Sequence, residues 1–118
     1  MKKSVIKTQA GKNRVANIIA KEIRSAVSIF TNTPKVEVKE ETDWFTNIYI
    51  KGEDNFCKML TFAEIDTVRE VVDLYAKKYE YGTITYTMQA SQYLTSDGQN
   101  WLPQPVLEVC VKQTNYKF

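Results

Sequence analysis

The sequence contains no histidine, and this absence removes several kinds of chemistry. Imidazole is the commonest general base, the usual partner of serine and cysteine nucleophiles, and a frequent zinc ligand. The chain also has only two cysteines, Cys57 and Cys110, which are too few for a four-thiolate zinc site. Both lie in apolar, strand-like segments, where free cysteine packs as a small hydrophobic side chain. We therefore expect no metal site and no catalysis by histidine or cysteine.

Glycine is scarce too, with four residues scattered singly along the chain. The dinucleotide-binding fingerprint and the P-loop each need several glycines in a short stretch, so neither phosphate-binding motif is present. Acidic residues gather at positions 40–43 and 53–54, but both groups fall at expected turns and lack the spacing of a calcium loop. We expect solvated turn charges at these positions, no cofactor, and a protein that is not an enzyme.

Long apolar runs are absent as well, and none approaches the roughly 18 residues of a membrane-spanning helix. The basic N-terminal segment lacks the apolar core and cleavage site of a secretory signal. These absences predict a cytoplasmic protein without a membrane partner. At 118 residues the chain is long enough for one hydrophobic core, and no sequence repeat or linker divides it. We expect a single domain over residues 1–118, with residues 1–10 as a flexible basic arm.

The clearest helix signal lies in residues 61–80. Thr61 and Glu64 have the spacing of a capping box, in which each side chain binds the backbone N–H of the other residue. Behind the cap, apolar residues recur at steps of three and four: Ile65, Val68, Val72, Tyr75 and Tyr79. Gly82 follows, where a helix is expected to have ended. The pattern predicts a helix of about 18 residues that lies on a sheet.

Other segments predict a second helix and three short strands. The helix is expected over residues 13–30, before Pro34 prevents its continuation. Alternating apolar and polar residues predict strands over 36–39 and 44–51. A third strand is expected over 56–60. It would form a hairpin in which Ile50 lies opposite Cys57 and Ile48 opposite Met59.

Residues 83–113 predict a long C-terminal β-hairpin around Asp97-Gly98, a strong two-residue turn. Residues at equal distances from this turn lie opposite each other. Four apolar pairs result, which are Leu94 with Trp101, Met88 with Leu107, Tyr86 with Val109, and Ile84 with Val111. The predicted fold class is α+β, with two helices over an antiparallel sheet of about five strands in the order α-β-β-β-α-β-β.

The tip of this hairpin carries four large apolar residues, Tyr93, Leu94, Trp101 and Leu102. A strand over residues 83–96 would reach about 46 Å, whereas the 61–80 helix covers roughly 27 Å of sheet. The tip either folds back onto the core or extends as an apolar anchor for another chain. The first hypothesis is therefore a small, non-enzymatic binding or adaptor protein that acts through this protein interface.

The partner in this hypothesis is a second copy of the chain, in a homodimer, or a host protein. Compact chains without catalytic motifs are of a kind that phages and mobile elements often encode to block or adapt host machinery. The general character of the sequence suggests such a host-factor inhibitor, although no residue identifies the partner.

The charge distribution gives a second hypothesis. Residues 1–35 hold eight Lys and Arg against one acid, a net charge of +7, whereas the remaining residues hold eight against thirteen, a net charge of −5. The basic N-terminal arm and first helix could bind the phosphates of a nucleic acid through Lys12, just before the helix, and through Arg14, Lys21 and Arg24 on it. The same charges could instead remain solvated or pair with acids of the protein itself.

Overall fold

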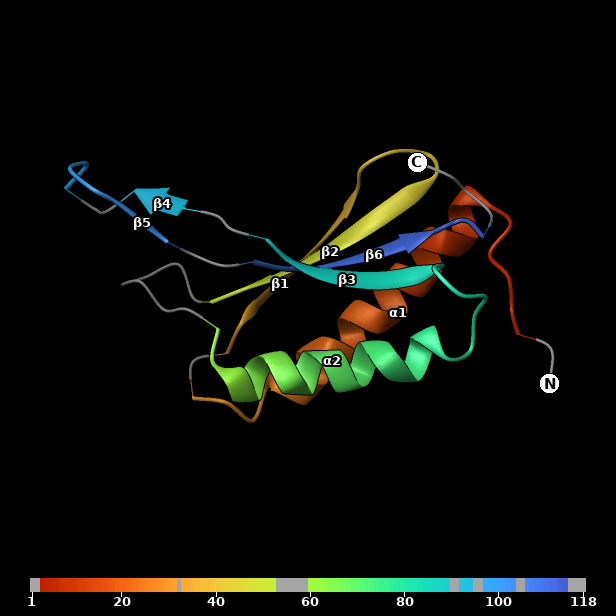
Figure 1. The fold of residues 1–118 in the computed structure, drawn as a ribbon, viewed down its shortest axis with the longest axis horizontal. Coiled ribbons are helices and arrows are strands. Elements are labelled where there is room, and N and C mark those ends of the chain that lie inside the picture. The colour runs from red at the N-terminus through yellow and green to blue at the C-terminus, as the bar shows by residue number, and fades with distance from the viewer. Residues whose placement is uncertain are drawn as a thin grey trace.

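The computed structural model describes residues 3–31, 33–52, 60–89, 92–94, 97–103 and 106–114. Its elements are α1 (Gln9–Val27), β1 (Lys35–Glu40), β2 (Phe45–Lys51), α2 (Phe62–Ala76), β3 (Ile84–Gln89), β4 (Gln92–Leu94), β5 (Trp101–Pro103) and β6 (Val106–Lys112). Four strands form an antiparallel sheet in the order β1-β2-β6-β3, and β4 and β5 form a separate two-stranded sheet. Both helices lie on one face of the larger sheet (Figure 1). The predicted α+β class is confirmed, with a main sheet of four strands instead of about five.

Helix α2 begins with the predicted capping box. Thr61 Oγ1 accepts from the Glu64 N–H at 3.2 Å, and Glu64 Oε1 accepts from the Thr61 N–H at 2.8 Å. Val68 and Val72 are buried in the core between the helix and the sheet. The apolar stripe of this helix therefore lies on the sheet, as the spacing predicts.

Residues 3–8, which precede α1, are part of the fold. The Ser4 N–H donates to the Lys78 carbonyl at 2.8 Å, and the Ser4 carbonyl accepts from the Glu80 N–H at 3.0 Å. Helix α2 ends at Ala76 instead of continuing to residue 80, and the backbone around Tyr79 pairs with Ser4. The sequence predicts a flexible arm over residues 1–10, whereas Ser4 is tied to the end of α2.

Ile6 fixes the same segment to the end of β6. Its N–H donates to Thr114 Oγ1 and its carbonyl accepts from the Thr114 N–H, both at 2.8 Å. The Ile6 side chain is buried in the core. A few residues later, Thr8 Oγ1 accepts from the Gly11 N–H at 2.9 Å and caps α1. Because of this cap, α1 begins at Gln9, four residues before the predicted start.

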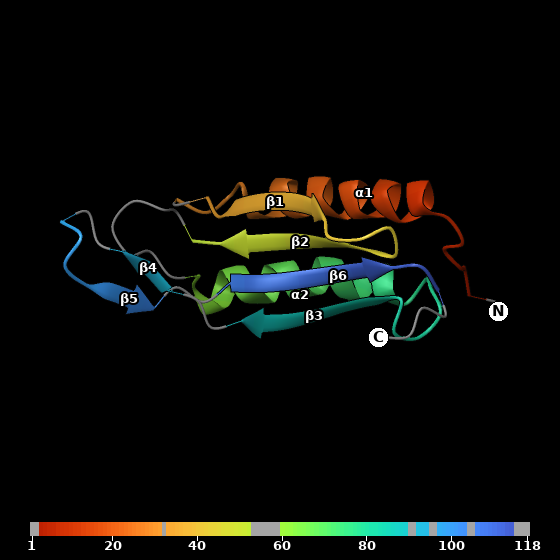
Figure 2. The same ribbon diagram turned by 90° about the horizontal axis from the view of Figure 1, so that it is seen from above.

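Strand β2 lies inside the sheet, between β1 and β6 (Figure 2). Its Ile48 lies opposite Val38 on one side and Val109 on the other. The predicted pairing of Ile48 and Ile50 with a third strand is therefore wrong, because both edges of β2 are already occupied. Residues 56–59 of that predicted strand lie outside the described part of the chain.

The predicted register of the long hairpin is confirmed. Every apolar pair expected from the Asp97-Gly98 turn is present: Ile84–Val111, Tyr86–Val109 and Met88–Leu107 in the main sheet, and Leu94–Trp101 in the small one. At the turn, Asp97 Oδ1 accepts from the Gln99 N–H at 2.9 Å, and Gly98 has a φ of 72°. This left-handed backbone favours glycine and fits a tight hairpin turn.

The two halves of the chain repeat one order of elements, a helix followed by a β-hairpin. The first unit consists of α1, β1 and β2, and the second of α2, β3 and β6. Each helix begins after a threonine N-cap, Thr8 or Thr61. β2 and β6 meet at the centre of the sheet and leave β1 and β3 at its edges. The β4–β5 sheet extends the second hairpin beyond the size of the first.

Candidate protein interface on the hairpin arm

The hairpin arm, here the described residues 92–94 and 97–103, continues the β3–β6 hairpin past the main sheet. β4 and β5 pair with each other in the register set by the turn. They lie beyond the end of the sheet and away from both helices, along the long axis of a molecule that measures 51 × 29 × 19 Å (Figure 1). Of the two arrangements that the sequence leaves open, the extended arm is the one present.

The four predicted interface residues occupy paired positions of the two strands of this arm. Leu94 lies opposite Trp101, and Tyr93 lies opposite Leu102, as two neighbouring cross-strand pairs. Trp101 is 63% exposed, although indole is among the most favourable side chains to bury. An exposed tryptophan on a two-stranded extension is a typical anchor for a protein partner, because Trp dominates the binding energy of many interfaces.

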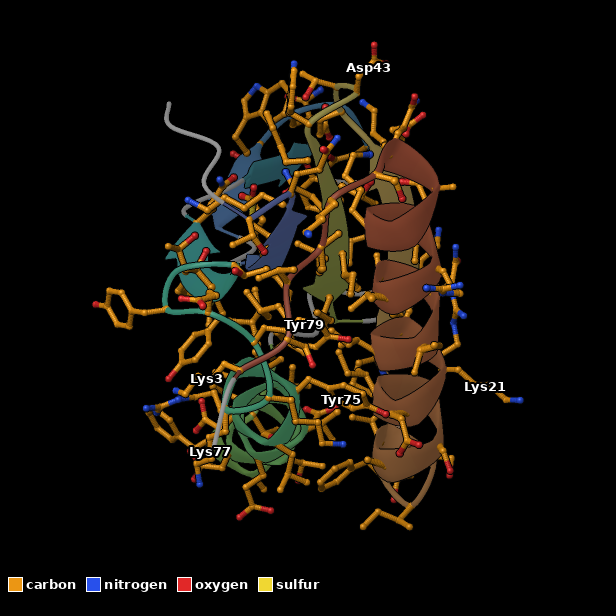
Figure 3. The ribbon with its side chains drawn as sticks, turned by 90° about the vertical axis from the view of Figure 1, so that its right-hand side faces the viewer. Lys3, Lys21, Asp43, Tyr75, Lys77 and Tyr79 are labelled. Carbon is orange, nitrogen blue, oxygen red and sulfur yellow. The ribbon has the colours of Figure 1, made fainter. Side chains whose placement is uncertain are left out.

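Three of the four predicted basic residues of α1 are exposed, and the fourth, Lys12, is buried. Arg14 and Lys21 are exposed, and Lys21 points away from the sheet (Figure 3). The Arg24 guanidinium is turned toward the edge of the sheet and donates to the Val36 carbonyl at 3.1 Å. Arg24 is exposed like Arg14 and Lys21, although it also binds the backbone of β1.

Lys12, the fourth predicted nucleic-acid contact, is completely buried. Its ammonium donates to Glu40 Oε2 and Thr46 Oγ1, each at 2.8 Å, and to Asn13 Oδ1 at 3.0 Å. A lysine has three N–H donors, and these three acceptors satisfy all of them. Lys12 is therefore unable to reach a phosphate in this fold. It pairs with an acid of the protein itself, the alternative that the charge distribution leaves open.

Glu40 and Asp43 of the acidic turn at 40–43 are exposed, as expected, and they also bind the start of α1. Glu40 Oε2 also accepts from Gln9 Nε2 at 3.0 Å and Asn13 Nδ2 at 2.7 Å, and Asp43 Oδ1 accepts from Gln9 Nε2 at 3.2 Å. Asp43 lies near the start of the helix (Figure 3). The hydrogen bonds from Lys12, Asn13 and Gln9 lower the pKa of Glu40 from 4.5 to about 2.

A second polar cluster, on the face of the sheet away from the helices, has no sequence signal beyond ordinary strand alternation. Asn47 Nδ2 donates to Glu108 Oε1 at 2.7 Å and to the Tyr49 hydroxyl at 3.1 Å, and that hydroxyl donates to Glu41 Oε1 at 2.5 Å. Burial, with the nearby Glu41 charge, raises the pKa of Glu108. Asn47 Oδ1 and Glu108 Oε2 are buried without a hydrogen-bond partner. The cluster consists mainly of acceptors and offers no paired nucleophile and base.

The described part of the chain offers little for metal or thiol chemistry. It contains no group of three or more Cys, Asp or Glu residues that could hold a metal ion. Burial and the neighbouring Glu108 raise the pKa of Cys110 to about 11, so that the thiol stays protonated at neutral pH and is a poor nucleophile. Cys57 lies outside the described residues.

Comparisons with known proteins add no function to these surfaces. Among the described helices, none is long and apolar enough to cross a membrane. No protein-family model, curated protein or solved structure matches the chain.

Proposed function

We propose that this chain is a small binding protein, without catalysis of its own, that attaches to another protein through the hairpin arm. The observation that carries the proposal is Trp101, which is 63% exposed on a two-stranded extension beyond the sheet. When a tryptophan side chain is buried in a partner's pocket, it removes more apolar surface from water than almost any other side chain does.

The construction of the arm supports a recognition role. Its two strands keep the register of the main hairpin, so the Trp101–Leu94 and Tyr93–Leu102 pairs are held on regular backbone and not on a loose loop. A short, rigid anchor loses less conformational entropy on binding than a flexible one. The partner that fits is a protein with an apolar pocket or groove wide enough for an indole ring. A host factor blocked or adapted by this chain is one such partner.

Trp101→Ala is the variant that tests the proposal. With a partner first captured by a photo-crosslinking amino acid at position 99, which leaves Trp101 in place, and then purified, titration calorimetry of Trp101→Ala should show binding weakened by about 2 kcal/mol or more. The free energy of unfolding should change little, because the side chain is exposed. Trp44→Ala is the matched control, since Trp44 is also an exposed tryptophan (51%) but lies at the β1–β2 turn. Equal loss of binding in both variants would refute the proposal.

The salt dependence of binding separates this function from the nucleic-acid alternative. Binding through an apolar anchor changes little with ionic strength, whereas binding to phosphates falls steeply as salt rises. Retention on DNA that disappears in salt and in an Arg14→Gln, Lys21→Gln double variant would favour the alternative. Arg14 and Lys21 are suitable positions because both are exposed on α1.

A further inference from the structure

The main sheet has two edges, β1 and β3, and their chemistry differs. β1 alternates charged residues along its length, Lys35, Glu37 and Lys39, and Arg24 covers its outward Val36 carbonyl. Charges and covering groups are the usual features that stop a second strand from pairing with an edge. β3 reads Ile-Thr-Tyr-Thr-Met-Gln and contains no charge and no proline. β3 has no charged residue of its own, although Arg69 of α2 donates to the Tyr86 hydroxyl at 3.1 Å.

The hydrogen-bond pattern shows which backbone groups of β3 face outward. The Lys112 N–H donates to the Thr83 carbonyl at 3.0 Å, which places Thr83 and Lys112 at a hydrogen-bonded position of the β3–β6 ladder, while the Thr83 N–H donates to the Glu80 carbonyl. Such pairs alternate with pairs that point the other way. The N–H and C=O groups of Ile84, Tyr86 and Met88 therefore point away from β6. Within the described part of the chain, no strand pairs with β3 on that side.

A second β3, running antiparallel and centred on Tyr86, matches this edge. Tyr86 then lies opposite Tyr86 of the second copy, and Ile84 lies opposite Met88, so the outward backbone groups of both strands meet each other. Opposite residues also share a face of the sheet. The apolar residues stay on the helix side, and Thr85 meets Thr87 on the other side. A shift of this pairing by one residue in either direction would place apolar residues opposite polar ones.

The surface beside β3 also has room for the opposite side chains. An open hollow of about 340 Å³ lies between the start of β3 and the end of α2, beside Ile84 and Tyr81. Lys3 and Lys77, labelled in Figure 3, border it. Tyr81 is fully exposed and Met88 is 44% exposed. Because Met88 of a second copy would lie opposite Ile84, it would enter this hollow and cover apolar surface that a single copy leaves in water.

We propose that the β3 edge joins two copies of this chain, with the β3 strands paired antiparallel about a two-fold axis at Tyr86. The two main sheets then form one continuous sheet. The lack of charge on β3 fits this occupant, because a symmetrical pair sets each residue near its own kind and like charges would repel. The inference does not depend on the hairpin arm, which lies beyond the paired region in both copies.

Met88→Lys and Ile29→Lys form the test pair, because each adds one positive charge at an exposed apolar residue. Sedimentation equilibrium over a concentration series should show the wild-type chain with twice its monomer mass. Met88→Lys should weaken the dimer by about tenfold or more, since it places a charge against apolar surface at the interface. Ile29 is 81% exposed just after α1, far from β3, and its variant should dimerise like the wild type.

Amide hydrogen exchange in the wild-type chain tests the register without any substitution. The N–H groups of Ile84, Tyr86 and Met88 should exchange more slowly as the protein concentration rises, whereas those of Thr85 and Thr87 are protected by β6 at all concentrations. A chain that stays monomeric at every concentration overturns the proposal. So does a dimer whose Ile84, Tyr86 and Met88 amides remain unprotected, or one that Trp101→Ala dissociates.

Discussion

Lys12→Ala should lower the free energy of unfolding by about 3 kcal/mol. The side chain is completely buried, so its removal leaves a cavity. It also leaves Thr46 and Asn13 without the donor that they share. Breaking a fully buried ion pair costs roughly 3–5 kcal/mol. The lower end applies here because the Glu40 side chain is 37% exposed and can be hydrated when its partner is lost.

Two further lysine variants separate the effect of the buried charge from the effects of lost volume and of removing any lysine from α1. Lys12→Met keeps most of the buried volume but removes the charge, and it should cost less than Lys12→Ala. Lys21→Ala removes an exposed lysine from the same helix and should change stability by less than about 0.5 kcal/mol. Denaturant unfolding followed by circular dichroism measures all three. If Lys12→Ala and Lys21→Ala unfold at the same midpoint, the buried ammonium does not hold α1 to the sheet.

The same contact should make stability depend on acid pH. The pKa of Glu40 is lowered from 4.5 to about 2 by its hydrogen bonds to Lys12, Asn13 and Gln9. A carboxyl group with a depressed folded-state pKa stabilises the fold above its ordinary pKa, and this contribution is lost as pH falls toward the folded value. We therefore expect stability to decrease between about pH 5 and pH 2. Glu40→Gln should flatten this part of the profile, whereas Glu37→Gln, on the exposed face of β1, should not.

Val72→Ala should lower the free energy of unfolding by about 2–3 kcal/mol. Val72 is 1% exposed and packs in the core between α2 and the sheet, and the alanine would leave a cavity that a close-packed interior cannot fill. Leu74→Ala is the control, two residues away on the same helix. It removes a larger side chain that is 61% exposed, so it should cost much less. Guanidinium unfolding compares the two.

A greater effect of Leu74→Ala than of Val72→Ala would contradict the packing of α2. The comparison is informative because helix propensity points the other way. Valine is the weaker helix former, so its replacement by alanine gains a few tenths of a kcal/mol of helix propensity, whereas the replacement of leucine gains less. A larger loss at Val72 therefore reports burial alone.

The parts of the fold that the sequence predicts correctly are those fixed by local chemistry. The capping box at Thr61 and Glu64 needs only a spacing of three residues, and it sets the start of α2. The register of the long hairpin follows from Asp97-Gly98, because a one-residue slip would move every side chain to the opposite face. This register also identifies Trp101 and Leu94 as neighbours at the tip.

The errors come from contacts between distant segments. The neighbours of β2 are chosen by tertiary pairing, so a local turn after residue 51 gives no reliable guide to what lies beside Ile48. For Lys12, a signal was present in the helix period. Lys12 lies four residues before Ala16 and seven before Ile19, and this spacing places it on the buried side of α1. A lysine at such a position has to find an acid inside the protein, and Glu40 supplies it.

The repeated helix-and-hairpin order has a consequence for how this chain folds. Within each half, the strands pair across a nearby turn, so β1–β2 and β3–β6 can close early and locally. The β2–β6 ladder is different, because it joins Ile48 to Val109 across more than half of the chain. The slow step should then be the docking of two preformed halves. We expect that two separate polypeptides, each carrying one helix and one hairpin, would form the same fold when they are mixed.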